Sequence, residues 1–357
     1  MKHFLQKTTR LLNVHLVIVF FGLLLMIPSP AFSLKYKHIV AFGDSLSDHN
    51  NLHSYVPDVR EAMTNGDVWI EYLARELNAS LDNNAFIGAM TRKHLKDDIQ
   101  ALSDNGTIPQ LGLVSQVDDY IAEQNTFNPD ETLFSIWIGS NNLIRYGRDT
   151  IDMTAEQKLL AAQVMITAAM TDIGEAVVKL LAIGATQFIV MNLPDIGKSP
   201  WYSQGTPEEV AASTFLATSY NDALKATVDQ LFLEKPKIKL YCFDMVQVMD
   251  EIIKKNIFPI TDDTFTVLDE GGFPTDETKG NAEDYLFWDG VHPTTKAHAY
   301  FANVVATSVL YDGYYSKQDL DDAVLQERMK WDVNNDSILG LEEAIHALKK
   351  CTEIPLK

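Results

Sequence analysis

The sequence predicts an α/β protein: a three-layer α/β/α domain with a parallel sheet between two layers of helices, followed by a small helical appendage. Short apolar runs alternate with amphipathic segments from residue 37 onward. Strands separated by helices of this length form parallel sheets covered on both faces. The composition then turns polar and helical after residues 313–317, which predicts the appendage.

Residues 1–33 have the features of a secretory signal peptide. Three basic residues and no acidic residue precede an apolar run at 16–27, and Ala31 and Ser33 supply small residues after it. This order is typical of a cleaved export signal. A membrane anchor is the alternative, but a spanning helix needs about 20 apolar residues. We therefore expect a secreted or periplasmic protein with no stable transmembrane anchor after signal removal.

The charge of the chain excludes one class of partner. The 357 residues carry a formal net charge of −20, and removing residues 1–33, with their three basic residues, takes it to −23. Such a chain repels phosphate backbones, so we expect no nucleic-acid partner. The sequence leaves the oligomeric state open.

The periodicity of the apolar residues predicts the elements of the domain. Short apolar runs predict strands at 38–42, 132–138, 188–191 and 238–243. Apolar residues recurring on one face predict helices at 68–77, 111–123, 155–183, 207–233, 245–255 and 294–310. Residues 256–284 show no period and are predicted to be a functional lid or a mobile loop.

The two cysteines leave a disulfide open. Export permits one, but Cys242 lies in an apolar strand-like run and Cys351 lies near the end of the chain. This placement favours a buried free thiol in the strand and a second thiol in the tail.

Ser45 is the first candidate for chemistry. It follows the strand at 38–42 and stands directly after Gly43-Asp44. Ligands of parallel α/β sheets bind at the carboxyl ends of strands, and a helix that follows offers backbone N–H donors. A serine that only caps a helix is the alternative.

Asp289 and His292 form the second candidate, in Trp288-Asp289-Gly290-Val291-His292-Pro293. A nucleophilic serine needs a neighbouring base, and the base needs an acid that orients it. Three residues across a glycine turn allow a carboxylate and an imidazole to meet on one loop. An ordinary surface loop is the alternative.

Asn141 and Gly88 complete the candidates. Asn141 follows the strand at 132–138, where its amide N–H suits a developing oxyanion; it equally suits a helix cap. Gly88 lies in the loop segment 83–89, where a glycine allows its own N–H to approach a substrate closely, although most loop glycines only turn the chain.

Together these segments resemble the four signature blocks of the GDSL/SGNH hydrolases: FGDSLSD, the segment around Gly88, IGSNN and WDGVHPT. Residues 184–197 also resemble the "LGA…NLP" stretch of the larger members. Those include bacterial phospholipases, lysophospholipases and glycerophospholipid–cholesterol acyltransferases, thermolabile haemolysins and plant GDSL lipases. The resemblance covers about residues 37–311 and implies a flavodoxin-like SGNH hydrolase domain at 34–312.

The resemblance implies a secreted serine esterase that needs no cofactor for catalysis. Ser45 would be the nucleophile, His292 the base and Asp289 its orienting acid. The N–H groups of Ser45 and Gly88 and the Asn141 amide would form the oxyanion hole. The substrate would be a lipid ester, most simply an acyl chain of a phospholipid or lysophospholipid, with transfer to an alcohol acceptor as a variant.

Two positions depart from the family pattern. The family commonly carries Asp after the oxyanion Asn, where this chain has Asn142, and a second glycine where this chain has Ile87. We expect activity to survive the first departure. The second weakens the assignment of Gly88 as a donor.

A calcium site is predicted in the helical segment 318–350. With Asp332 as position 1, the side chains of Asp332, Asn334, Asp336 and Glu343 and the carbonyl of Ile338 fall at the ligand offsets of an EF-hand loop. The segment resembles single EF-hands and dockerin-type loops. Ser337 stands where glycine is expected. A polar turn between two helices is the alternative.

Two other functions remain open from the sequence. One is removal of acetyl groups from polysaccharides, which the same family performs and which a narrow polar pocket would favour. The other is a binding module that kept the fold and lost catalysis, which the intact Ser45, Asp289, His292 and Asn141 argue against.

Overall fold

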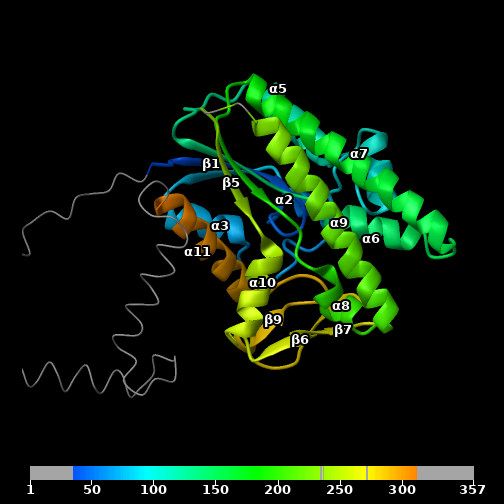
Figure 1. Ribbon diagram of the computed structural model, residues 1–357. Coiled ribbons are helices and arrows are strands. Elements are labelled where there is room, and N and C mark those ends of the chain that lie inside the picture. The colour runs from blue at the N-terminus through cyan, green and yellow to red at the C-terminus, as the bar shows by residue number, and fades with distance from the viewer. Residues whose placement is uncertain (1–34, 234, 236, 271, 312–357) are drawn as a thin grey trace, which may run out of the picture. The chain divides into compact units, whose positions relative to one another are not determined.

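The structure, a computed structural model, describes residues 35–311 except 234, 236 and 271 (Figure 1). The predicted signal peptide at 1–33 and the predicted calcium segment at 318–350 lie outside the described residues.

A five-stranded parallel sheet forms the centre of the domain. Its strands, in spatial order, are β2 (Ser80–Asn83), β1 (His38–Gly43), β3 (Thr132–Trp137), β4 (Gln187–Met191) and β5 (Lys239–Phe243). The order 2-1-3-4-5 is that of flavodoxin-like sheets, whose ligands bind where the order reverses, between β1 and β3. The predicted fold class is confirmed.

Helices cover both faces of this sheet, because successive strand residues point to opposite sides. In β3, Leu133 and Trp137 join one buried cluster while Phe134 and Ile136 join the other. The first cluster includes α3 (Trp69–Glu76), α10 (Met245–Lys254) and α11 (Thr295–Tyr311), and the second includes α5 (Leu113–Ala122), α7 (Ala155–Ala182) and α9 (Pro207–Phe232). Figure 1 shows these two groups of helices on either side of the strands.

The two longest helices begin and end where the sequence supplies the signals. At the start of α7, the Thr154 hydroxyl accepts the Gln157 N–H and the Gln157 side chain accepts the Thr154 N–H. Thr206 and Glu209 form the same reciprocal cap on α9. After α7, Gly184 adopts a φ of +97°, the left-handed conformation that ends a helix.

Short elements surround the carboxyl ends of the strands. The helices are α2 (Asn51–Tyr55), α4 (Asp97–Asp104), α6 (Ser140–Asp149) and α8 (Pro200–Ser203), with 3₁₀ turns at Ile196–Lys198 and Ala282–Asp284. The strands are β6 (Ile260–Thr264), β7 (Thr266–Leu268), β8 (Pro274–Thr278) and β9 (Tyr285–Phe287). β6 pairs with β9, and β7 pairs with β8 as a hairpin.

The local structure differs from the sequence analysis in three places. Residues 256–284 are not a structureless loop, because they contain β6, β7 and β8, whose polar, short sequences carry no apolar alternation. The edge strand β2 was missed for the same reason, since it reads Ser-Leu-Asp-Asn. Cys242 is exposed, because β5 lies at the edge of the sheet.

The described residues contain no helix that is both long enough and apolar enough to span a membrane.

Candidate active site

Ser45 lies two residues beyond the end of β1, held by contacts around Gly43. The side-chain oxygen of Gln116 accepts the Gly43 N–H at 2.9 Å, and its amide donates to the Gly43 carbonyl at 2.9 Å. A Cβ on Gly43 would lie 2.5 Å from the Trp137 carbonyl oxygen, so β1 and β3 approach too closely for any other residue. The turn that presents Ser45 therefore requires glycine there.

His292 meets Ser45 from a loop far along the chain. The loop lies between β9 and α11, and His292 Nε2 lies 2.8 Å from Ser45 Oγ. On the other side of the ring, Nδ1 lies 2.9 and 2.8 Å from the two carboxylate oxygens of Asp289. The predicted residues Ser45, His292 and Asp289 thus form one continuous hydrogen-bonded chain.

The loop itself fixes the Asp289 carboxylate. Oδ1 accepts the backbone N–H of Val291 at 2.9 Å and of His292 at 2.7 Å, and Asp289 is 4% exposed. The backbone of Trp288 donates to the His292 carbonyl at 2.8 Å, which closes the turn. The Asp-x-x-His spacing works because the carboxylate caps the turn that carries its own histidine.

Burial and charge act in opposite directions on this pair. Burial alone would lower the pKa of His292, but the charge and hydrogen bond of Asp289 outweigh it and raise the pKa above its usual 6.5. Burial alone would raise the pKa of Asp289, but the His292 charge, its hydrogen bond and the two backbone N–H groups bring the pKa below 3.8. Asp289 therefore stays ionised and orients the imidazole.

Each of the three predicted oxyanion donors has an N–H without an acceptor among the described residues. The backbone N–H groups of Ser45 and Gly88 have no acceptor among the described residues. Asn141, at the start of α6, uses one amide hydrogen on the Ala89 carbonyl at 2.9 Å, which leaves the other unused. This bond links the two predicted donors, since Ala89 follows Gly88.

Residues 39–305 match the GDSL-like lipase/acylhydrolase family. This chain belongs to that family. It is therefore a hydrolase that acts on ester bonds.

Three relatives are similar to this GDSL hydrolase over more than half of its length. The thermolabile hemolysin of Vibrio parahaemolyticus is 26% identical over 301 residues, which cover 77% of this chain and 64% of that protein. The phosphatidylcholine-sterol acyltransferase of Aeromonas hydrophila is 25% identical, over 78% of this chain and 91% of that protein. The acetylesterase of Thermothelomyces thermophilus is 26% identical, over 57% of this chain and 68% of that one.

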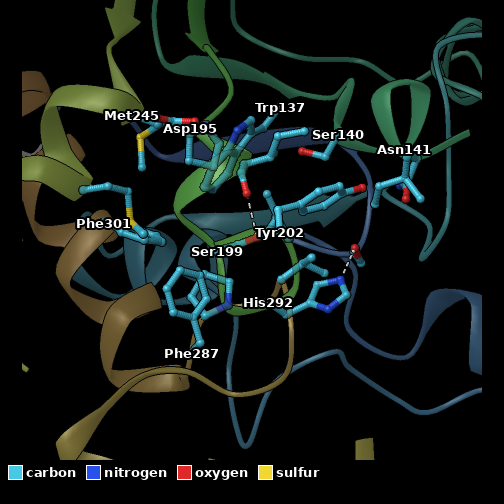
Figure 2. Close-up of a pocket in the computed structure, with 18 residues that line it drawn as sticks. Trp137, Ser140, Asn141, Asp195, Ser199, Tyr202, Met245, Phe287, His292 and Phe301 are labelled. Atoms are coloured by element: carbon cyan, nitrogen blue, oxygen red, sulfur yellow. Dashed lines mark hydrogen bonds between the residues drawn. The ribbon is translucent and has the colours of Figure 1, made fainter. Parts of the chain in front are cut away.

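The pocket of this GDSL hydrolase is lined mainly by apolar side chains, and Asp195, Ser199 and Tyr202 add polar groups to its wall. Figure 2 shows Ser140, Asn141 and His292 on one side and Met245, Phe287 and Phe301 on the other. Other apolar lining residues are Leu46, Trp137, Ile144, Pro194, Ile196, Met249 and Val291. The pocket is partly open, and its cavity volume is about 50 Å³. An ester placed with its carbonyl at Ser45 has an apolar wall for its acyl group.

Asn142, the departure from the family pattern, has a supporting contact. Its side-chain oxygen accepts the Thr91 N–H at 3.2 Å, and its amide donates to Thr91 Oγ1 at 3.1 Å. Thr91 Oγ1 donates in turn to Asp172 at 2.8 Å, and Asp172 pairs with Arg92. Asn142 therefore fastens the end of the 83–91 segment to α6.

Sequence reasoning missed two residues that shape the site. Asp48 is fully buried, and its Oδ2 accepts the N–H of Ile87 at 2.6 Å, which ties the nucleophile turn to the glycine segment. Its place at the end of FGDSLSD was a signal that could have been used. His94, which contacts Gly88, lies outside all four blocks, so no motif indicated it.

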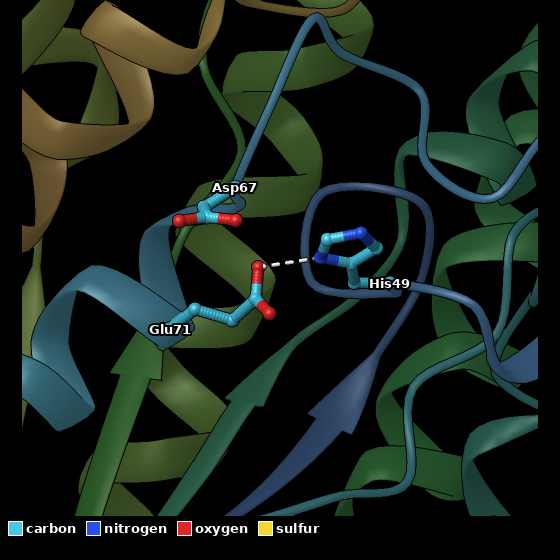
Figure 3. Close-up of side chains that lie close together, drawn as sticks. All are labelled: His49, Asp67 and Glu71. Atoms are coloured by element: carbon cyan, nitrogen blue, oxygen red, sulfur yellow. Dashed lines mark hydrogen bonds and ion pairs between the residues drawn. The ribbon is translucent and has the colours of Figure 1, made fainter.

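One cluster among the described residues has metal-ligating chemistry. His49, Asp67 and Glu71 place one potential ligand atom each within 4.8 Å of one another (Figure 3). Each group already has a partner: His49 Nδ1 lies 2.8 Å from Glu71, Glu71 accepts the Val68 N–H at the start of α3, and Asp67 pairs with Arg75. These contacts explain the cluster as a helix start with its ion pairs.

Proposed function

We propose that this chain is an exported serine esterase that hydrolyses acyl esters of phospholipids or lysophospholipids. The observation that carries the proposal is the Ser45–His292–Asp289 chain on one side of a pocket lined mainly by apolar side chains. Export is proposed from residues 1–33, whose basic, apolar and small-residue order is that of a signal peptide.

The geometry supports a two-step acyl transfer. Ser45 Oγ bonds to the ester carbonyl carbon while its proton passes to His292 Nε2, and the carbonyl electron pair moves onto oxygen. The N–H groups of Ser45, Gly88 and Asn141 would hold that oxyanion. When the tetrahedral intermediate collapses, the alcohol leaves with the proton from His292 and the acyl group remains on Ser45.

Water completes hydrolysis in the second step. His292 takes a proton from water, the oxygen bonds to the acyl carbon, and the acid leaves as Ser45 Oγ recovers its proton. An alcohol in place of water would give acyl transfer by the same steps. The similarity to a phosphatidylcholine-sterol acyltransferase is the reason to test an alcohol acceptor.

A second candidate is an esterase for acetyl groups. The cavity volume of about 50 Å³ holds only a few water-sized groups, which suits an acetyl group without rearrangement. A long acyl chain would have to displace side chains, and Met245 and Met249 are the flexible ones in the wall. The similarity to an acetylesterase points the same way.

One experiment decides between the two substrates. The mature protein and its Ser45→Ala variant are incubated with phosphatidylcholine and lysophosphatidylcholine vesicles and with acetylated xylan, and released acids are quantified. We expect fatty acid from the wild type only. Release of acetate alone would replace the lipid assignment with the acetyl one, and a folded Ser45→Ala that kept its activity would refute the assignment of the nucleophile.

We also propose that segment 318–350 binds Ca²⁺ through Asp332, Asn334, Asp336, Glu343 and the Ile338 carbonyl. The support is the offset of these oxygens along the sequence. Calorimetric titration of the full mature chain should show one site that Asp332→Ala removes. Absence of heat at millimolar Ca²⁺ would refute the site.

A further inference from the structure

The residue that holds the Ile87–Gly88 peptide is His94, which no signature block contains. His94 is 2% exposed, and its Nε2 lies 2.8 Å from the Ile87 carbonyl oxygen. On the other side of the ring, Nδ1 accepts the backbone N–H of Lys96 at 3.0 Å. The loop returns on itself to allow this contact, through a bridge between Ala89 and His94.

These two contacts define the tautomer of His94. A carbonyl oxygen only accepts, so the contact with Ile87 requires the hydrogen on Nε2. In the neutral ring Nδ1 then carries the lone pair and accepts the Lys96 N–H, while the Lys96 carbonyl lies 3.3 Å from it. Burial lowers the pKa of His94, so the ring stays neutral near pH 7. Nε2–H therefore donates to the Ile87 carbonyl.

The same contact sets the direction of the Gly88 N–H. In a planar trans peptide the C=O and the N–H point in opposite directions. Since His94 draws the Ile87 carbonyl toward itself, the Gly88 N–H points away from the ring, and within the described part of the chain it meets no acceptor. A hydrogen bond onto the carbonyl also polarises the N–H of that peptide and strengthens it as a donor.

Contacts with the two flanking peptides leave the Ile87–Gly88 peptide little freedom. Asp48 accepts the Ile87 N–H at 2.6 Å, and the Gly88 carbonyl accepts the Leu95 N–H at 2.8 Å. Gly88 has a φ of +77°, and a Cβ there would lie 2.3 Å from His94 Nε2. The ring thus packs directly against the Gly88 Cα, which requires a glycine at 88 even though Ile87 replaces the second glycine of the family pattern.

We propose that His94 is a positioning residue of the oxyanion hole, which aims the Gly88 N–H at the oxyanion through the Ile87 carbonyl. His94 acts through the peptide and does not touch the substrate. The proposal rests on the proposed function, in which Ser45 is the nucleophile and Gly88 one of the donors.

The test compares four variants of the full mature chain: His94→Phe, His94→Gln, His94→Asn and Ser45→Ala. Phe keeps a ring but has no hydrogen-bond donor. The Gln amide reaches the Ile87 carbonyl, whereas the Asn side chain is too short to reach it. The control is His38→Phe, since His38 bonds Ser80 at the opposite end of β1. Readouts are kcat and KM on p-nitrophenyl butyrate, the Ki of a trifluoromethyl ketone that forms an oxyanion on Ser45, and the thermal midpoint.

Removal of a whole oxyanion donor lowers kcat about 10²–10³-fold, so a misdirected donor in His94→Phe should lower kcat on the order of 10–100-fold. We expect KM to change little and the Ki of the ketone to rise by the same factor as kcat falls. The fall of activity at acid pH reflects protonation of His292, so its midpoint should not change. His94→Gln should recover most of the rate, and His38→Phe should match the wild type.

The proposal is refuted by a folded His94→Phe with wild-type kcat and ketone affinity, or by a loss that appears in KM alone. If His94→Phe does not fold, the comparison of Gln with Asn decides: equal rates refute the proposal, and a faster Gln variant supports it. A Ser45→Ala variant that stays active would instead refute the proposed function, so the two failures are distinguishable.

Discussion

Replacing Asp289 by Asn isolates the role of its charge from its role in the fold. Oδ1 of Asp289 accepts the backbone N–H groups of Val291 and His292, and the Asn carbonyl oxygen can keep both bonds. The Asn amide then occupies the Oδ2 position, 2.8 Å from His292 Nδ1. An amide donates where the carboxylate accepted, so Nδ1 must become the acceptor.

This exchange forces the hydrogen of His292 onto Nε2, which faces Ser45 at 2.8 Å. A protonated Nε2 cannot accept the Ser45 proton, and comparable triads lose about 10⁴ in kcat when the tautomer is reversed. That factor corresponds to about 5.5 kcal/mol of transition-state stabilisation. We expect the same loss here on p-nitrophenyl butyrate near pH 8, with a thermal midpoint close to that of the wild type.

Asp289→Ala serves as the comparison. It leaves the Val291 and His292 N–H groups without their acceptor, at about 1–3 kcal/mol for each unsatisfied buried group, so this variant should be less stable as well as inactive. The reasoning about the tautomer is wrong if folded Asp289→Asn keeps more than about a hundredth of the wild-type rate, because geometry alone would then support catalysis.

Three further predictions follow from the site. His292 must be neutral to act as a base, and its pKa is raised above 6.5, so kcat/KM should begin to fall at a pH above 6.5 as the solution is acidified. Full activity at pH 5 would contradict this. Asp44 is 1% exposed, and burial raises its pKa from 3.8 to about 7. Between these pH values the native state holds a proton that the unfolded state releases, so the protein loses stability as the pH rises from 3.8 to about 7. Asp44→Asn should remove this loss and raise the thermal midpoint more at pH 8 than at pH 4; equal shifts at both pH values would disprove the assignment. Asn142→Asp should place a carboxylate oxygen against Thr91 Oγ1, whose hydrogen already goes to Asp172, and lower stability by about 1–2 kcal/mol while activity stays within tenfold, as thermal unfolding and the ester assay would show.

The sheet and its covering helices were predictable because their signals are local. The strands β1, β3 and β4 bury both faces, so each appears in the sequence as a continuous apolar run. β2 and the elements β6 to β8 lie at edges or near the surface, where side chains are polar and pairing depends on distant partners. The exposure of Cys242 was decided in the same way, by the position of β5 at the edge of the sheet.

The active site also has a part that the sequence predicts and a part that it does not. The sequence alone determined the chemical groups, because a serine, a base, an acid and an amide stand in four blocks whose order and spacing are specific in combination. Only the tertiary structure decided which groups hold those blocks in place. Asp48, His94 and Gln116 act on backbone atoms up to 73 residues away, and a backbone N–H or carbonyl has no identity in the sequence. The reacting residues can therefore be predicted from the sequence, whereas the contacts that orient them can be identified only in the folded structure.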